Sequence, residues 1–421
     1  HFRLAEDWVR AADYAMQAGA QAVKVYAMSE ALAHYDNAIE ALKRLPDAPP
    51  ERLCDAILGW TPAALKLKPY GEVLDRLKEA EEIARELGDQ ARLARVLHWI
   101  ANAYISNGFP TLGMPALFES YQLAERLGDE RLTLVATFWM TADMIDRNPR
   151  GGLEQLEYVI EAAHKYRNRE VEAHALTKKA MAHARLGEFA EAQEAVERAF
   201  EASRKTDSVV NGADVALGSS LAFLDMGDVS RGLEYSQRGT EQALSAQGLE
   251  CAMYGHYCTG LGNLHSRNLT EAKRAFESAL KLLTDNLSEL QGSEVVANEV
   301  RAGLAIARFF AGDSEAIDDM KRALTNAEAV GDDYTVAFVA QTLGEGYTQL
   351  RDFEKAKQYL DTALDYYRRN DMRPYLARTL RSLVYWYEQQ GRIAEAEQAR
   401  AEAQRLMEEL SLPPMHPLSS P

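Results

Sequence analysis

The chain has 421 residues, of which 26% are charged and 47% hydrophobic, a balance typical of a folded globular protein. Its 47 basic and 64 acidic side chains give a net charge of −17, which disfavours a nucleic-acid partner because binding phosphates needs a basic surface. Three cysteines are too few for a disulfide framework and suit a reducing compartment, so we expect a cytoplasmic location. We find no apolar run long enough to span a membrane and no signal peptide, so no membrane partner is predicted.

A phrase repeated at an interval of forty residues marks the first predicted helices. Residues 84–93 read ARELGDQARL and residues 124–133 read AERLGDERLT. Glycine accepts the left-handed conformation that ends many helices, and aspartate is a favoured capping residue at a helix start. We therefore expect Gly88 to end one helix and Asp89 to cap the next. Similar helix-ending signals lie near Gly128, Asn168, Gly248, Gly331 and Asn370.

Small residues seven positions apart follow short turns farther along the chain. Ala192 and Ala199 follow the turn RLGEF at residues 185–189, and Gly232 and Gly239 follow DMGDV at 225–229. Positions seven apart share one helix face, so small residues there let two helices approach closely. The spacing thus predicts a helix pair around each turn.

These marks predict an all-α protein, a right-handed α-solenoid (a superhelix) of about ten helix–turn–helix units with a period of ~40 residues. No segment shows the alternation typical of a strand. We expect residues 1–410 to form a single domain and the Pro- and Ser-rich tail 411–421 to be disordered. The units are predicted near 8–44, 51–87, 90–127, 130–167, 169–205, 208–246, 248–284, 290–329, 333–369 and 372–410.

The ninth predicted unit resembles a tetratricopeptide repeat. Its sequence QTLGEGYTQLRDFEKAKQYLDTAL, residues 341–364, contains the pair Leu343-Gly344 with Tyr347 three residues later. The seventh unit matches in its second half, NLTEAKRAFESAL. The period exceeds the 34 residues of the standard repeat and is similar to that of bacterial signalling ATPases and of maltose-regulator-type transcription activators.

A narrower resemblance covers about the first 145 residues. The stretch SEALAHYDNAIEALKRLPDAPPERLCDAILGW, residues 29–60, is similar to one in large bacterial adenylate/guanylate cyclase proteins. Those proteins place a cyclase domain first, a signal-transduction ATPase next and a tetratricopeptide array last. The chain starts with His1 and not with Met, so we expect it to be the repeat region of a longer protein. The cyclase carboxylates and the ATPase phosphate loop have no counterpart here.

Motifs for catalysis and for cofactors are missing from the sequence. It contains no GxxxxGK[ST], GxGxxG, HExxH or GxSxG pattern, so we predict neither an enzyme nor a bound cofactor. The densest set of potential metal ligands is Cys251, His256, Cys258 and His265. His256 and Cys258 point to nearly opposite sides of one predicted helix, so they cannot converge on one metal ion, and no metal site is predicted.

A candidate binding surface runs along the first helix of each unit, which lines the concave side of a stacked helical array. Aromatic, Arg and Asn side chains suit binding of an extended peptide or a partner helix, and the Arg residues of the last three units favour an acidic segment. The other interpretation is that these side chains bond neighbouring helices and line a wet groove. The candidates are Arg95, His98, Asn102, Tyr254, Tyr257, Asn298, Arg301, Arg308, Gln341, Arg378, Arg381 and Tyr385, with Leu261, Leu264, Phe338 and Glu345 on the same stripes.

The sequence therefore predicts a non-catalytic protein-interaction and regulatory scaffold, the repeat region of a bacterial cyclase or signalling ATPase. Its partner would be a peptide, a protein or a neighbouring domain of the same polypeptide. One alternative is a small-ligand sensor like a maltose-type activator, with a pocket near Trp99, Trp139 and Tyr104. A third and weakest alternative is an enzyme.

Overall fold

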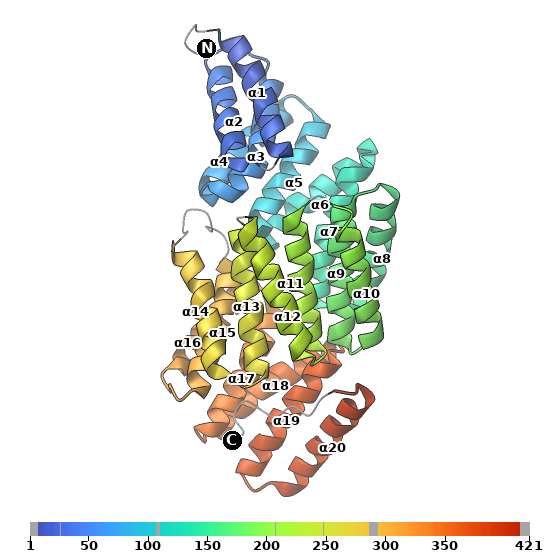
Figure 1. Ribbon diagram of the computed structural model, residues 1–421, viewed down its shortest axis with the longest axis vertical. Helices are drawn as coiled ribbons and strands as arrows, with labels where there is room; N and C mark the ends of the chain where they lie inside the picture. The colour runs from blue at the N-terminus through green and yellow to red at the C-terminus, as the bar shows by residue number, and fades with distance from the viewer. Residues whose placement is uncertain are drawn as a thin grey trace. The chain divides into compact units, whose positions relative to one another are not determined.

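The computed structural model describes residues 7–412 apart from 26, 107–109, 207, 247 and 286–293. Twenty α-helices and no strand occur among these residues, and the helices follow one another as ten helix–turn–helix units (Figure 1). The all-α helical-repeat solenoid predicted from the periodicity is confirmed. The predicted tail 411–421 lies outside the described residues beyond Leu412.

The helices of the first five units are α1 (Trp8–Lys24), α2 (Met28–Lys43), α3 (Pro50–Leu67), α4 (Tyr70–Glu86), α5 (Gln90–Ser106), α6 (Pro110–Leu127), α7 (Glu130–Arg147), α8 (Pro149–Lys165), α9 (Arg169–Leu186) and α10 (Phe189–Ser203). Those of the last five are α11 (Val209–Asp225), α12 (Val229–Ser245), α13 (Leu249–His265), α14 (Leu269–Asp285), α15 (Glu294–Phe310), α16 (Ala316–Val330), α17 (Asp333–Gln349), α18 (Phe353–Arg369), α19 (Arg373–Gln389) and α20 (Ile393–Glu409).

The repeated phrase forms the joint between two units, as predicted. Gly88 and Gly128 have φ angles of 65° and 67°, in the left-handed region. Oδ1 of Asp89 accepts a hydrogen bond from the Arg92 amide at 3.0 Å, and Oδ1 of Asp129 accepts one from the Leu132 amide at 3.1 Å. These are the helix-capping bonds expected of aspartate at a helix start.

Three of the predicted helix-ending residues were assigned to the wrong position. The left-handed conformation is adopted by Arg167 (φ 57°) in place of the predicted Asn168, and by Asp371 (φ 53°) in place of the predicted Asn370. Asn168 instead caps α9, accepting from the Val171 amide at 3.2 Å, and Gly248 stands at the start of α13 with φ −83°. The helix is closed by backbone bonds, such as Arg167 N to His164 O at 3.1 Å, and these form whatever the side chain.

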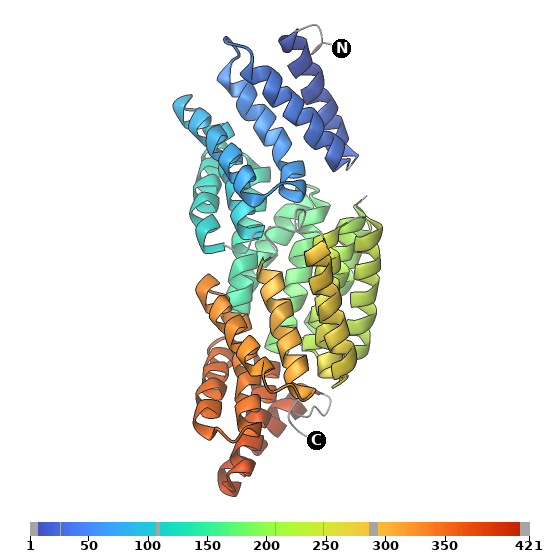
Figure 2. The ribbon, with the colours of Figure 1, turned by 90° about the vertical axis from the view of Figure 1, so that its left-hand side faces the viewer.

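The small residues seven apart lie where the two helices of a pair touch. A Cβ added at Gly232 would come 2.6 Å from Cδ2 of Leu224, and one at Gly239 would come 2.6 Å from Cδ2 of Leu217. α12 therefore packs on α11 more closely than any larger residue would allow. Figure 2, a view turned by 90°, shows the same side-by-side course of successive helices.

The helices group into two compact units. Unit 1 comprises His1–Thr137 with Asn286–Glu294, and unit 2 comprises Phe138–Asp285 with Val295–Pro421. That residues 1–410 form a single domain stays a prediction. In the part of the chain that the structure describes, none of the helices is both long and apolar enough to cross a membrane.

Candidate functional site

Unit 2 contains a cavity of about 110 Å³ that is lined by first helices alone, namely α9, α11, α13, α17 and α19. Within unit 2, α9 packs on α11, α11 on α13, and α17 on α19, so the first helices of successive pairs form a wall. α19 also packs on α9, which places the last first helix of unit 2 beside its earlier ones. Residues at the C-terminal ends of α9, α11 and α13 thereby meet residues near the N-terminal ends of α17 and α19.

A buried carboxylate stands at this meeting point. Asp225, 5% exposed, accepts a hydrogen bond at Oδ1 from the Tyr375 hydroxyl. Because Tyr375 donates its single proton there, the Tyr334 hydroxyl is the donor in the 2.7 Å bond between the two tyrosine oxygens. Nε of Arg185 lies 3.8 Å from Oδ2 of Asp225, and the Arg185 guanidinium lies 4.5 Å from the centre of the Tyr334 ring.

Burial dominates the electrostatics of these groups. It raises the pKa of the Asp225 carboxyl above its ordinary value, although Arg185, the Tyr375 hydroxyl and Arg378 act in the opposite direction. Burial likewise raises the pKa values of Tyr334 and Tyr375, and the Asp225 charge adds to that effect. Both tyrosines therefore keep their protons and serve as hydrogen-bond donors.

Two arginines of α19 lie on one face at an i, i+3 spacing, and both line the cavity. Nη2 of Arg378 donates to the carbonyl oxygens of Leu224 at 3.1 Å and of Asp225 at 2.9 Å, which binds α19 to the C-terminal end of α11. Nε of Arg378 and Nη1 of Arg381 are buried and donate to no described residue. Burial lowers the pKa of Arg381 although the Glu345 carboxylate opposes the change.

A neutral histidine adds to the polar part of the lining, which also includes Gln341, Thr342 and Glu345. Burial, together with the charge of Arg378, lowers the pKa of His265 to about 3. Its Nδ1 atom is buried and has no hydrogen-bond partner among the described residues. The remaining lining is apolar and consists of Leu221, Leu224, Leu261, Leu264 and Phe338.

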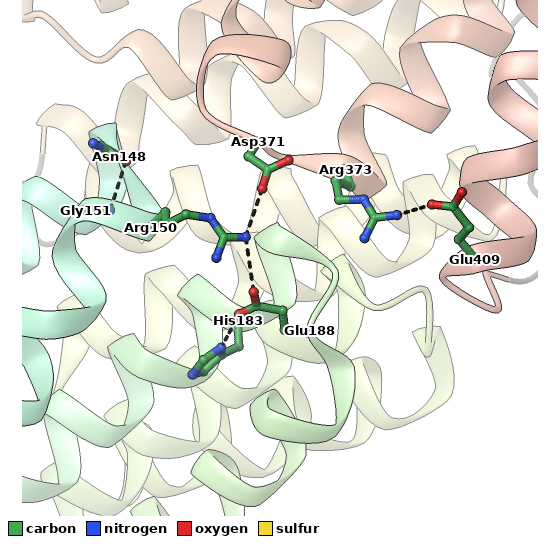
Figure 3. A network of polar contacts seen from close by, with 8 residues as sticks. All are labelled: Asn148, Arg150, Gly151, His183, Glu188, Asp371, Arg373 and Glu409. Carbon is green, nitrogen blue, oxygen red and sulfur yellow. Dashed lines mark hydrogen bonds and ion pairs between the residues drawn. The ribbon is translucent and has the colours of Figure 1, made fainter.

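Ion pairs outside the cavity connect α8, two turns and the last helix pair (Figure 3). Arg150, at the start of α8, donates to Glu188 at 3.1 Å and to Asp371 at 2.9 Å, and Nδ1 of His183 lies 2.6 Å from Oε2 of Glu188. Arg373 pairs with Glu409 nearby. These pairs link the start of α8 and the α9–α10 turn to the α18–α19 turn.

The structure brings four predicted groove residues together in this cavity. They are Tyr257, Gln341, Arg378 and Arg381, and the residues Leu261, Leu264, Phe338 and Glu345 of the same stripes join them. Tyr257 is buried, and burial raises its pKa well above the ordinary value. The expectation that first helices carry the binding surface is thus consistent with the position of this cavity.

Three other predicted residues line a separate pocket between α15 and α16. Nδ2 of Asn298 donates to the carbonyl oxygen of Ala323 at 3.1 Å. Arg308 is paired with Asp313 at 2.6 Å and with Asp319 at 2.8 Å. Arg301 is exposed on the same helix. Asn298 and Arg308 are therefore engaged by neighbouring elements, as the alternative interpretation of the sequence expected.

The remaining candidates lie apart from the cavity. Arg95 is exposed and donates from Nε to the Ala91 carbonyl at 3.3 Å, whereas Asn102 is half-buried. His98 is buried, and burial lowers its pKa to about 4. In unit 2, the ring of Tyr254 lies 5.7 Å from that of Tyr257, and Tyr385 is half-buried on α19.

Six polar residues of the cavity were not among the predicted groove residues, namely Arg185, Asp225, His265, Tyr334, Thr342 and Tyr375. Arg185, Asp225 and His265 are forty residues apart and each opens one of the short turns, so they occupy the same position of three successive repeats. Their shared position in the repeat could have indicated that the three side chains lie near one another. Tyr334 and Tyr375 stand near the starts of α17 and α19, and only the packing of α19 on α9 brings them to these three.

The described residues contain no group of three or more His, Cys, Asp or Glu side chains that could hold a metal ion. Sγ of Cys251 lies 2.9 Å from Oδ1 of Asp214, while Cys258 is fully buried. Burial raises the pKa of the Cys258 thiol, so it remains protonated and is a poor ligand or nucleophile.

The family model of anaphase-promoting complex subunit 5 matches residues 9–104, 153–213 and 346–411, more than half of the chain. The chain belongs to this family. The three stretches matched by the anaphase-promoting complex subunit 5 model lie in the helical pairs described above, and the last of them includes Arg378 and Arg381. No curated protein matches the chain.

Three solved structures share the fold at low sequence identity. A Rap protein in complex with competence and sporulation factor has a TM-score of 0.66 at 11% identity, over 85% of this chain and 98% of that one. The apo quorum sensor NprR from B. thuringiensis has a TM-score of 0.53 at 12% identity, over 86% and 99%. The Rap conjugation regulator of plasmid pLS20 in complex with the Phr* peptide has a TM-score of 0.51 at 14% identity, over 86% and 96%.

Proposed function

We propose that this chain is a non-catalytic, peptide- or protein-binding regulatory scaffold that receives its ligand in the cavity of unit 2. The observation that carries the proposal is the convergence of five first helices on one cavity, with guanidinium groups that are not fully hydrogen-bonded. Binding sites combine apolar walls with a few such polar groups, because the walls supply affinity and the polar groups fix orientation.

The titles of two solved structures support a peptide ligand. One Rap protein is complexed with competence and sporulation factor, and the pLS20 Rap regulator is complexed with the Phr* peptide. Both share the helical-repeat architecture over most of this chain. A scaffold that presents first helices around a central space is therefore compatible with peptide binding.

The resemblance of residues 29–60 to cyclase–ATPase proteins supports the place of this scaffold in a larger bacterial signalling protein. In the proposed mechanism, a peptide, a protein or a neighbouring domain occupies the cavity and biases the state of an attached ATPase or cyclase domain in the cytoplasm. Sequencing the genomic reading frame upstream of His1 tests this: an ATPase or cyclase domain is expected, and an in-frame stop codon contradicts the proposal.

Selection of peptides on the immobilised chain tests the binding function itself. We expect a related set of peptides to be recovered, and Phe338→Ala to weaken them about tenfold because an aromatic anchor is removed from the cavity wall. The matched control is Phe118→Ala, which removes a 54% exposed aromatic side chain from α6. Failure to recover peptides, or equal losses in the two variants, contradicts the proposal.

A small-ligand sensor of the maltose-regulator type is the second candidate, and the small volume of the cavity favours it. The cavity includes none of Trp99, Trp139 and Tyr104, around which a ligand pocket was predicted. A thermal-shift screen of metabolites distinguishes the two candidates, because a ligand of the folded state raises the melting temperature. Stabilisation by a free metabolite, together with no recovered peptide, favours the sensor.

A further inference from the structure

The charges that line the cavity do not balance. The lining contains three guanidinium groups, of Arg185, Arg378 and Arg381, and two carboxylates, of Asp225 and Glu345. His265 is neutral at physiological pH because its pKa is lowered to about 3. Glu299 of α15 acts electrostatically on Tyr257 and Tyr334 but is not part of the lining. One positive charge of the lining is therefore left without a carboxylate in the same cavity.

The two lining carboxylates already have partners. Asp225 accepts from Tyr375 and lies 3.8 Å from Arg185. Oε1 of Glu345 accepts from the Ser382 hydroxyl. Arg185 is further engaged with the Tyr334 ring. The positive charge in excess therefore resides on the α19 pair, Arg378 and Arg381.

Hydrogen-bond donors are also in excess on these two side chains. Nε of Arg378 and Nη1 of Arg381 are buried and have no acceptor in the described part of the chain. A buried guanidinium N–H without an acceptor is costly, so such groups mark a place for an acceptor. Burial lowers the pKa of Arg381, and the Glu345 carboxylate acts in the opposite direction.

The apolar part of the lining indicates which kind of ligand would carry the hydrogen-bond acceptor. Leu221, Leu261, Leu264 and Phe338 form apolar walls next to the arginines. The volume of about 110 Å³ is on the order of ten times what one buried water molecule needs, so a side-chain-sized group fits.

Resting on the proposed binding function, we infer that the cavity binds one carboxylate group carried by an apolar residue, with Arg378 and Arg381 as the donors. A carboxylate matches the single excess charge and accepts hydrogen bonds from guanidinium in fixed geometry. A water molecule would accept the hydrogen bonds but leave the excess positive charge uncompensated. A phosphate dianion carries more negative charge than the single excess positive charge of the lining. The carboxylate can belong to the C-terminus of a peptide or to a free acid.

The first test compares N-acetyl-L-leucine with N-acetyl-L-leucinamide by thermal shift and calorimetry on the whole chain. The two probes differ only in the carboxylate. We expect the acid to raise the melting temperature by several degrees at saturating concentration and the amide to leave it unchanged. Equal binding of both probes, or no binding of the acid at tens of millimolar, overturns the inference.

Variants of α19 give the second test. Arg381→Gln should weaken N-acetyl-L-leucine about tenfold or more, because a charge-assisted hydrogen bond is lost. Arg381→Lys keeps the positive charge and should therefore lose less affinity for N-acetyl-L-leucine than Arg381→Gln. The matched control Arg274→Gln removes a highly exposed guanidinium from α14 and should leave binding unchanged. An unchanged affinity in a folded Arg381→Gln variant overturns the inference, and the acid–amide comparison decides if that variant does not fold.

A peptide recovered by selection, made with a free and with an amidated C-terminus, separates this inference from the proposed function. If only the peptide with a free C-terminus binds, and its binding depends on Arg381, the proposed function and the inference both stand. The carboxylate is then that of a peptide C-terminus. If both forms bind equally and Arg381→Gln has no effect, peptide binding stands and the inference fails. If no peptide is recovered but N-acetyl-L-leucine binds through Arg381, the inference stands with a free acid and the peptide function fails.

Discussion

Two polar clusters, one around Trp60 in unit 1 and one around Asp225 in unit 2, differ in how far their groups are satisfied. In unit 1 the fully buried indole of Trp60 donates from Nε1 to Oδ1 of Asp36 at 3.0 Å, and Arg76 donates to the same oxygen at 2.8 Å while its guanidinium lies 4.4 Å from the indole ring. Ile57 and Leu77, both fully buried, pack in the same core. These polar groups are satisfied by one another and surrounded by apolar side chains.

In unit 2 the buried polar groups surround a cavity and are only partly satisfied. Asp225 has Tyr375 and Arg185 as partners, but one N–H group of Arg378 and one of Arg381 have no acceptor among the described residues. A satisfied polar group in a packed core stabilises the fold, whereas an unsatisfied one beside a cavity can be satisfied by a ligand. The Trp60 cluster therefore serves packing, whereas the arginines of α19 keep hydrogen-bond donors that our proposal assigns to a ligand.

The largest expected effect is on the core of unit 1. Trp60→Ala should lower the free energy of unfolding by about 3–5 kcal/mol, because a large buried ring is replaced by a cavity. Tyr334→Phe in unit 2 removes only a hydroxyl that donates to Tyr375 and should cost about 1 kcal/mol. Urea titration measures both. A larger loss for Tyr334→Phe than for Trp60→Ala would contradict the expected difference between the two clusters.

The second prediction concerns acid sensitivity and the buried histidine of each unit. Burial lowers the pKa of His98 to about 4, and burial with Arg378 lowers that of His265 to about 3. Unfolded histidine has a pKa near ~6.5, so below that pH the unfolded chain takes up the proton first and stability falls as the pH decreases. From pH 6.5 to about 4, His98 alone should cost on the order of 3 kcal/mol.

Replacing each histidine by glutamine separates the two contributions. Urea unfolding at pH 7 and at pH 4.5 should show a shallower loss of stability for His98→Gln and for His265→Gln than for the wild type. A saturating carboxylate ligand should reduce the contribution of His265 only, because the ligand charge offsets that of Arg378. An identical pH dependence in wild type and both variants speaks against buried neutral histidines.

The smallest expected effect is at the joints, which do not differ between the units. Asp89→Ala in unit 1 and Asp332→Ala in unit 2 each remove a cap, to the Arg92 amide and to the Thr335 amide, both at 3.0 Å. Each should cost about 1 kcal/mol of unfolding free energy. Because both joints rely on the same kind of bond, the two losses should be nearly equal. The melting temperatures of the two variants measure these losses. A difference of several kcal/mol between the two variants would contradict the expectation that the joints are equivalent.

Much of the fold could be predicted because each repeat is specified by residues that are close together in the sequence. Gly88 and Asp89 form a helix end and a helix start within two residues, and the same pair recurs at Gly128 and Asp129. The prediction erred at Asn168, where the neighbouring Arg167 takes the left-handed position, because backbone hydrogen bonds close that helix without regard to the side chain.

The candidate site could be predicted only in part. Tyr257, Gln341, Arg378 and Arg381 followed from the rule that first helices line the inner side. Asn298 and Arg308 followed from the same rule, yet their hydrogen bonds and ion pairs are made within α15, α16 and the turn between them. Helical periodicity identifies the face on which a side chain lies, but not which groups from distant repeats will meet it.

The helical repeat, its period near forty residues and the face of each first helix could be predicted from the sequence, because these depend on spacings of a few residues. The packing of α19 on α9 beside the cavity became visible only in the folded chain. Tyr375 and Asp225 are 150 residues apart and form a hydrogen bond at this cavity. The physical reason is that small rotations between successive helix pairs add up along the chain, and their sum is not encoded in any single repeat.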